Sequence, residues 1–205
     1  MTDPSGVFEA TAMPDRDWWS ALWPDPGKVL AEVGLRPGAR AVDLGCGDGW
    51  FTRAMAELAC AEPGAGEVTA IDLDPAMLAA AKAELAGSGA PVRFVRADML
   101  DASAVVTDPV DFALIANTFH GAPDKPALAR AVRTLLAPGG RFVAVNWWPS
   151  EREQTPVLGQ PRGPRPALRF APEQVAAWVE PAGFRLVEVR EVGPYHYGAV
   201  FEAIA

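Results

Sequence analysis

The sequence has only two cysteines, an excess of acidic over basic residues, and no apolar run long enough to cross a membrane. Cys46 and Cys60 form neither a metal-binding spacing nor a disulfide framework, so we expect no metal and a reducing compartment. The net charge of -8 argues against a nucleic-acid partner, which normally requires a basic surface. Residues 1–14 have no basic start and no long apolar core, so no signal peptide is expected. These absences predict a cytoplasmic monomer or homodimer that binds no metal, nucleic acid or membrane.

What is present is enough apolar sequence for one domain. Half of the 205 residues are apolar, which allows a substantial core. Apolar strand-like segments alternate with amphipathic helical ones, which predicts an α/β domain: a doubly wound, mostly parallel sheet with helices on both faces. The expected strands cover residues 40–44, 68–72, 92–96, 110–116 and 141–146, and the expected helices cover 26–33, 50–60, 75–85, 125–137 and 172–182. Residues 184–192 and 195–204 alternate apolar and polar side chains, which predicts a closing antiparallel hairpin.

The most informative segment is residues 42–50, Val-Asp-Leu-Gly-Cys-Gly-Asp-Gly-Trp, where a buried strand meets a glycine-rich turn and then a helix. Glycines let the backbone approach a bound nucleoside closely, because they add no bulk and tolerate positive φ. Asp72 ends the next expected strand, where an acid can bind a ribose. The dinucleotide fingerprint needs a small residue at position 50, which holds Trp50, whereas the third glycine comes at Gly49. This spacing favours an S-adenosylmethionine (SAM) site over a dinucleotide site.

The glycine pattern, the acids at the strand ends and Leu-Ala-Pro-Gly-Gly at residues 136–140 together resemble the class I SAM-dependent methyltransferases. The resemblance covers roughly residues 38–204. It implies a Rossmann-like seven-stranded sheet of order 3-2-1-4-5-7-6 with the last strand antiparallel. It further implies a SAM-binding domain over residues 37–205, with a loop insertion at 149–169, and a lid formed by the N-terminal segment and helix of residues 1–36. SAM is then the cofactor and S-adenosylhomocysteine (SAH) the product.

The resemblance also assigns roles along the strand ends. It places Asp43 and the glycine turn against the methionine portion of the cofactor, Asp72 on both ribose hydroxyls, Leu73 on the adenine face, and Asp98 on the adenine amino group. The segment after residue 116 passes beside the sulfonium. The expected cofactor-binding residues are Asp43, Gly45, Cys46, Gly47, Gly49, Asp72, Leu73, Asp98, Met99, Asn117 and Thr118.

The acceptor side is less well defined by sequence. His120 is the candidate catalytic residue, because an imidazole there can act as a general base, although it can instead position substrate or bond Asp124. Trp18, Trp23, Trp147 and His196 are the expected substrate-binding residues. Aromatic walls can exclude water, stack on a flat substrate or bind a cationic amine, or they can simply pack. The insertion carries four arginines against two glutamates, which either steer an anionic substrate or are solvated.

The chain shows no second domain and no basic appendage for a polymer, so we expect methyl transfer to a small-molecule acceptor by in-line displacement. Two alternatives remain open at this point. One is a non-catalytic SAM-binding module that regulates a partner. The other is an NAD-linked oxidoreductase, against which Trp50 and the terminal hairpin count.

Overall fold

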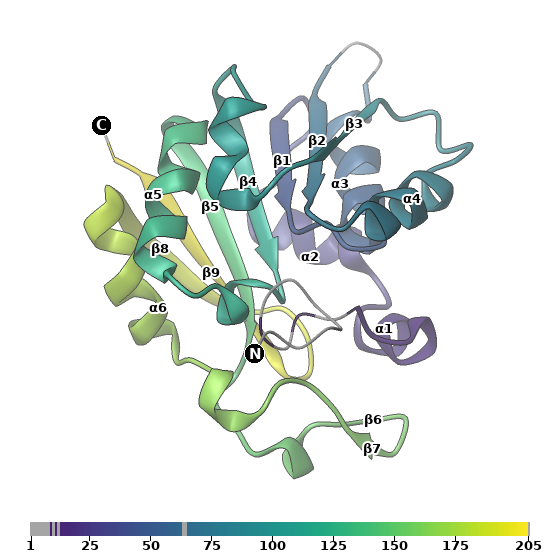
Figure 1. Ribbon diagram of the computed structural model, residues 1–205, viewed down its shortest axis with the longest axis vertical. Coiled ribbons are helices and arrows are strands. Elements are labelled where there is room, and N and C mark those ends of the chain that lie inside the picture. The colour runs from purple at the N-terminus through teal and green to yellow at the C-terminus, as the bar shows by residue number, and fades with distance from the viewer. Residues whose placement is uncertain (1–8, 10, 12, 63–64, 205) are drawn as a thin grey trace.

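A single twisted sheet organises the molecule. The computed structural model describes residues 9, 11, 13–62 and 65–204 (Figure 1). The strands of the main sheet are β1 (Arg40–Leu44), β2 (Glu67–Asp72), β3 (Val92–Arg96), β4 (Val110–Ala116), β5 (Leu136–Trp147), β8 (Phe184–Glu191) and β9 (His196–Ala203). Their order is β3-β2-β1-β4-β5-β9-β8. Strands β1 to β5 are parallel, and β9 runs antiparallel to both β5 and β8. The expected seven-stranded Rossmann-like sheet is therefore confirmed.

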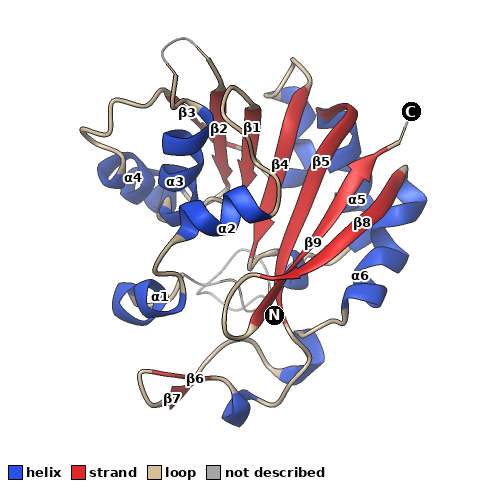
Figure 2. Cartoon of the chain, turned by 180° about the vertical axis from the view of Figure 1, so that it is seen from behind, coloured by secondary structure: helices blue, strands red, loops and turns tan. Residues whose placement is uncertain are grey.

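Helices cover both faces of this sheet, as expected. The helices are α1 (Arg16–Leu22), α2 (Pro26–Glu32), α3 (Trp50–Ala59), α4 (Pro75–Glu84), α5 (Lys125–Leu135) and α6 (Pro172–Val179). Helices α5 and α6 pack on one face, and α2, α3 and α4 pack on the other (Figures 1 and 2). The central strands β1 and β4 are mostly apolar because both of their faces are buried, which is typical of parallel sheets. Among the described residues, no helix is both long and apolar enough to span a membrane.

Three elements differ from the sequence-based expectation. Strand β5 begins at Leu136 rather than at Arg141, because Leu136 already pairs with Val110 before an irregularity in the register. Helix α1 was not expected. It buries Trp19 and Leu22 on one side, three residues apart, and is held by that packing. The insertion is not a plain loop, since it contains the short antiparallel pair β6 (Pro156–Val157) and β7 (Gln160–Pro161).

Helix α1 and the insertion lie together beyond the carboxyl ends of the parallel strands (Figures 1 and 2). Glu9 forms an ion pair with Arg165 of the insertion, and the Arg162 guanidinium lies 5.3 Å from the centre of the Trp18 ring. Two segments that are distant in sequence therefore cover the same end of the sheet. Part of the lid expected over residues 1–36 lies outside the described residues.

Candidate active site

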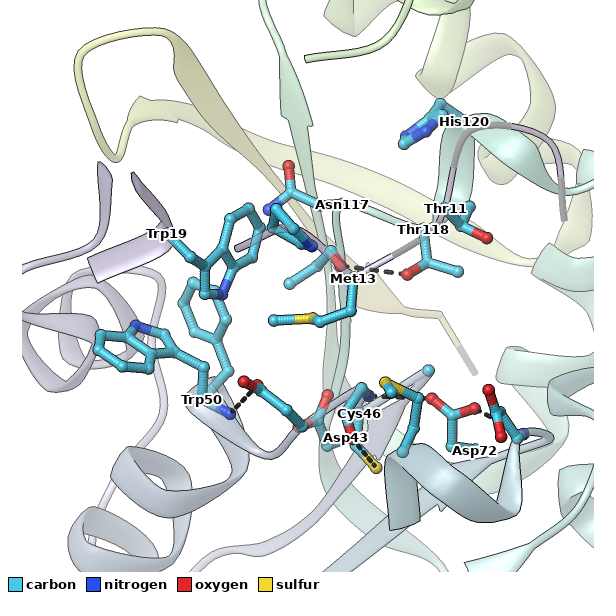
Figure 3. A pocket seen from close by; sticks show the side chains of 18 of the residues that line it. Thr11, Met13, Trp19, Asp43, Cys46, Trp50, Asp72, Asn117, Thr118 and His120 are labelled. Atoms are coloured by element: carbon cyan, nitrogen blue, oxygen red, sulfur yellow. Dashed lines mark hydrogen bonds between the residues drawn. The ribbon is translucent and has the colours of Figure 1, made fainter. Parts of the chain in front are cut away.

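One cavity of about 650 Å³ opens at the carboxyl ends of β1 to β4, beneath α1 and the insertion. Its volume is within the range of roughly 300–1,000 Å³ that small-molecule sites occupy. Open parallel sheets bind ligands at this edge. Most of the expected site residues line it: Trp18, Asp43, Gly45, Cys46, Gly47, Asp72, Leu73, Asp98, Met99, Asn117, Thr118, His120 and Trp147. Figure 3 shows Asn117 and His120 across the cavity from Asp43 and Asp72.

The turn after β1 forms a cradle that only glycine permits. Gly45 and Gly47 have φ values of 76° and 55°. A Cβ atom on Gly45 would lie 3.2 Å from the Thr118 side chain, and one on Gly47 would lie 3.0 Å from Met13 Sδ. The backbone N–H groups of Gly45 and Cys46 donate to the Ile71 carbonyl at 2.8 and 3.0 Å. The turn is thus fixed to the end of β2 and leaves its surface open to the cavity.

Asp43 is a buried carboxyl group at the end of β1. Asp43 is 2 % exposed, and the Thr52 hydroxyl Oγ1 donates a hydrogen bond to Asp43 Oδ2 at 2.6 Å. The pKa of Asp43 is raised to about 7, chiefly by burial; the Thr52 hydrogen bond opposes the rise and the nearby Asp72 adds to it. A carboxyl group held near neutral pKa in a cavity is a typical feature of a functional site.

Asp72 connects the two turns that frame the cavity. Its Oδ2 accepts from the Gly47 N–H and its Oδ1 from the Asp74 N–H, both at 2.9 Å. Asp74 itself caps α4 by accepting from Ala76 N–H at 2.7 Å. An ionised carboxylate has about four acceptor positions, so each oxygen of Asp72 keeps capacity for a ligand hydroxyl.

Asp98 and Met99 stand at the end of β3. Asp98 caps the 3-10 turn over Met99–Ala104, its Oδ1 accepting from Leu100 N–H at 2.9 Å. Met99 is buried and lines the cavity close to Gly45. Both residues therefore line the cavity at the end of β3, next to the end of β2, where Asp72 lies.

The segment after β4 carries strained backbone and unsatisfied polar atoms. Asn117 has φ of 56°, which non-glycine residues seldom adopt. Both polar atoms of its side chain are buried with no hydrogen-bond partner among the described residues. Such atoms cost free energy unless a ligand or water meets them. His120 is 3 % exposed in the next turn and also lines the cavity, while Asp124 caps α5 by accepting from Ala127 N–H at 2.8 Å.

Three expected residues do not reach the cavity. Trp23 is 1 % exposed and packs 5.2 Å from Phe51 and 4.5 Å from His196, measured between ring centres. His196 is fully buried behind Trp147, and burial lowers the pKa of its imidazole well below the usual value. The prediction that Trp23 and His196 line the substrate pocket is therefore corrected: both belong to the core. Gly49 packs against Ala81 of α4, so its small size serves helix packing.

The cavity also has walls that sequence reasoning missed. They include Met13, Trp19, Asp48, Trp50, Phe51 and Met77. Arg152 and Arg162, two of the four insertion arginines that the sequence offered as a means of steering an anionic substrate, also line the cavity. Trp50 and Phe51 form the first turn of α3, and Met77 lies in the first turn of α4. A signal was available for these three, because the first turns of helices that follow β1 and β2 must face the ligand edge of the sheet. The strand ends, the glycine cradle and the cavity that they line define a Rossmann-like domain that binds a nucleoside cofactor.

Comparison with known proteins supports this class. Residues 41–140 match the family model described as "Methyltransferase domain". The ubiquinone biosynthesis O-methyltransferase of Xanthomonas axonopodis pv. citri (strain 306) is 30% identical over 190 residues, covering 84% of this chain and 77% of the relative. A SAM-dependent methyltransferase from Aquifex aeolicus has a similar structure, with a TM-score of 0.76, 25% identity, and coverage of 93% of this chain and 94% of that one.

A third similar structure is the 1,6-didemethyltoxoflavin-N1-methyltransferase of Burkholderia thailandensis, solved with 1,6-didemethyltoxoflavin and SAH. It has a TM-score of 0.65 and 24% identity, covering 93% of this chain and 82% of that chain, and this likeness concerns the fold. The chain belongs to the class I SAM-dependent methyltransferases. Its cofactor is SAM, as the resemblance of its sequence motifs to this family implied.

Proposed function

We propose that this enzyme transfers the methyl group of SAM to a small-molecule acceptor, and that Asp43, Asp72, Asp98 and Asn117 hold the cofactor. The observation that carries the proposal is that the strand ends of β1 to β3 and the His120 turn after β4 open into one cavity. Cofactor and acceptor can therefore occupy one continuous cavity and come into contact there. The cavity lies beneath α1 and the insertion, which favours a small acceptor over a polymer. The Xanthomonas relative is itself described as an O-methyltransferase of ubiquinone biosynthesis.

The cavity offers SAM a matching set of groups. The carboxyl group of Asp43 suits the ammonium group at the methionine end, and the free acceptor positions of Asp72 suit two ribose hydroxyls. Leu73, Asp98 and Met99 lie where the base would follow. Gly45, Cys46 and Gly47 give backbone access, although the Met13 thioether lies over Gly47 and must move aside. The unpartnered amide of Asn117 and the neighbouring Thr118 line the wall across the cavity from Asp43.

When bound, SAM supplies an electrophilic methyl group with a good leaving group. The protein then has to align the acceptor atom with that methyl group and exclude water. Trp18, Trp19 and Trp147 provide apolar walls for this purpose. His120 borders the same space, and we propose that its imidazole takes the proton of an acceptor hydroxyl or amine. The residues 1–36 would act as a lid over this reaction.

We further propose that the protein works in the cytoplasm as a monomer or homodimer, without a nucleic-acid, membrane or metal partner. Both cysteines are unpaired, which suits a reducing compartment. Among the described residues, no group of three or more histidine, cysteine or acidic side chains is placed to hold a metal ion.

The experiment that tests the proposal is a calorimetric titration with SAM and, in parallel, NAD, followed by an acceptor panel with SAH formation as the readout. Binding of SAM alone and turnover of any small acceptor support it. Tight SAM binding with no turnover on phenol, amine and thiol acceptors would favour the regulatory module instead. Binding of NAD with no binding of SAM would favour an oxidoreductase and refute the proposal.

A further inference from the structure

Charge is divided between the two ends of the cavity. The acidic residues of its wall lie at the ends of β1 and β2 and in the turns after β1, β2 and β3: Asp43, Asp48, Asp72, Asp74 and Asp98. The cationic residues of its wall, Arg152 and Arg162, come from the insertion. The cofactor is cationic, so the acidic end suits it, and the cationic end is left for the second substrate.

Arg162 lines this second end, and its guanidinium forms no ion pair with a described acidic residue. Its Nε is buried with no hydrogen-bond partner among the described residues, and its guanidinium lies 5.3 Å from the centre of the Trp18 ring. Neither Arg162 nor Arg152 forms an ion pair with a described acidic residue, in contrast to Arg165, which pairs with Glu9. Glu151 and Glu153 flank Arg152 in sequence, and all three are exposed, but of the three only Arg152 lines the cavity.

Arg169 fixes the insertion in the position that brings these charges to the cavity. Its residue is 4 % exposed, and it donates to the carbonyls of Pro164 and Arg162 at 3.0 and 2.8 Å. It also donates to the hydroxyls of Ser150 and Thr155 at 2.9 and 3.1 Å. All of these hydrogen-bond partners are neutral, and the Arg169 guanidinium lies 4.9 Å from the Trp147 ring centre. Burial and the nearby Arg152 lower the pKa of Arg169, and the charges of Glu151 and Glu153 oppose that fall. The cationic end is therefore rigidly built.

The walls next to these arginines are flat and apolar. Trp18, Trp19 and Trp147 line the cavity beside the insertion. Aromatic rings favour a planar partner. A guanidinium group favours a carboxylate, which it can bind through two parallel hydrogen bonds. A cationic amine is disfavoured here, since two unpaired arginines would repel it.

We propose that the methyl acceptor is a planar aromatic molecule with a carboxylate, which Arg162 and Arg152 bind while its ring lies against Trp18. This proposal rests on the proposed function in one respect, namely that the bound carboxylate is the molecule that receives the methyl group. The anion site itself does not depend on methyl transfer and can be measured separately.

The test uses two matched pairs of probes that differ only in charge: 3,4-dihydroxybenzoate with its amide, and 3-hydroxy-2-naphthoate with its amide. Each is titrated by calorimetry into the full chain, with and without SAH. We expect each carboxylate to bind at least about tenfold more tightly than its amide, because a charge-assisted hydrogen bond is lost in the amide. Raising the salt concentration should weaken the carboxylates alone.

Substitutions assign that preference to the arginines. Arg162→Gln should remove most of the carboxylate-to-amide ratio, Arg162→Lys should keep part of it, and the double variant Arg152→Gln/Arg162→Gln should abolish it. Arg165→Gln is the matched control, since it removes the same charge from the same insertion outside the cavity wall. Thermal unfolding would verify that each variant is folded.

Three outcomes would overturn the inference: amides that bind as tightly as carboxylates, a ratio that survives in the double variant, or no saturable carboxylate binding at millimolar concentration. If SAM fails to bind while the carboxylate preference holds, the proposed function is at fault and the anion site stands. If SAM binds and neutral acceptors are preferred, the substrate class is at fault and the proposed function stands.

Discussion

Binding of SAM should release a proton near neutral pH, because Asp43 is the buried carboxyl group that we assign to the cationic end of the cofactor. Its pKa is raised to about 7, chiefly by burial, so at pH 7 about half of the free protein carries a protonated Asp43. A cationic ligand favours the ionised form and lowers this pKa. The proton held by the other half is then released on binding.

The size of the effect follows from the pKa. If only the ionised form accepts the cofactor, the apparent dissociation constant is multiplied by one plus the ratio of protonated to ionised Asp43. That factor is about 11 at pH 6 and about 1.1 at pH 8 for a pKa of about 7. Affinity for SAM should therefore rise about tenfold between these pH values, which corresponds to about 1.4 kcal/mol.

The assay is calorimetric titration with SAM at pH 7 in two buffers whose protonation enthalpies differ, since the difference in observed heat counts the protons released. We expect about half a proton in the wild type. Asp43→Asn should release none and lose the pH dependence. His120→Gln is the necessary control, because its imidazole lines the same cavity and is a second group that can release a proton. No release in the wild type, or a release that persists in Asp43→Asn, would refute the assignment.

The same carboxyl group should affect stability with the opposite sign from most acids. Because the pKa of Asp43 is raised from 3.8 to about 7, the folded state binds more protons than the unfolded state between these values. Its contribution to the free energy of unfolding therefore decreases as pH rises through this window. The difference in stability between wild type and Asp43→Asn should follow that decrease.

Three further predictions concern cofactor binding, the core and the insertion. Asp72→Ala should weaken SAM binding at least about 100-fold, because two hydrogen bonds to a carboxylate are lost, and unchanged affinity would refute the ribose assignment. Trp23→Ala should lower the free energy of unfolding by about 3–5 kcal/mol in urea titrations. Trp18→Ala, on the half-exposed cavity wall, should cost much less, and equal costs would contradict the placement of Trp23 in the core. Arg169→Ala should make the insertion more susceptible to limited proteolysis, because it removes four hydrogen bonds, whereas Arg165→Ala, which removes one exposed ion pair, should raise the cleavage rate much less.

The sheet could be predicted from sequence because each central strand is short, apolar and bounded by clear turn residues. Strand β1 has the expected limits, since Gly38 precedes it and Gly45 follows it. Strand β5 begins earlier than expected because Leu136 adds a pairing that lies across an irregularity from Arg141. Helix α1 has seven residues, and its own propensity cannot hold it, so its existence depends on tertiary packing that the sequence pattern does not reveal.

The site residues also fall into two groups: those that the sheet positions, which sequence can predict, and those that depend on tertiary packing. Residues at strand ends, such as Asp72 and Asn117, reach the cavity because the sheet alone places them there. Arg162 and Trp50 could not be placed from sequence with the same certainty, since their positions depend on how the insertion and α3 pack. His196 begins β9, but its side chain points into the core between Trp23 and Trp147. Nearness in sequence to the end of a strand does not fix which face a side chain occupies.

The proposed cofactor end of the cavity is built by the sheet, whereas α1 and the insertion build the opposite end. The insertion is also joined to the segment before α1 by the ion pair of Arg165 with Glu9. Substitutions in the sheet endanger the fold, but substitutions in these segments leave the central strands intact. The enzyme can therefore acquire a different acceptor by changing two exchangeable pieces while its cofactor chemistry is inherited unaltered. Chimeras that receive both pieces from a relative should adopt that relative's preference, whereas transfer of either piece alone would leave the two halves mismatched.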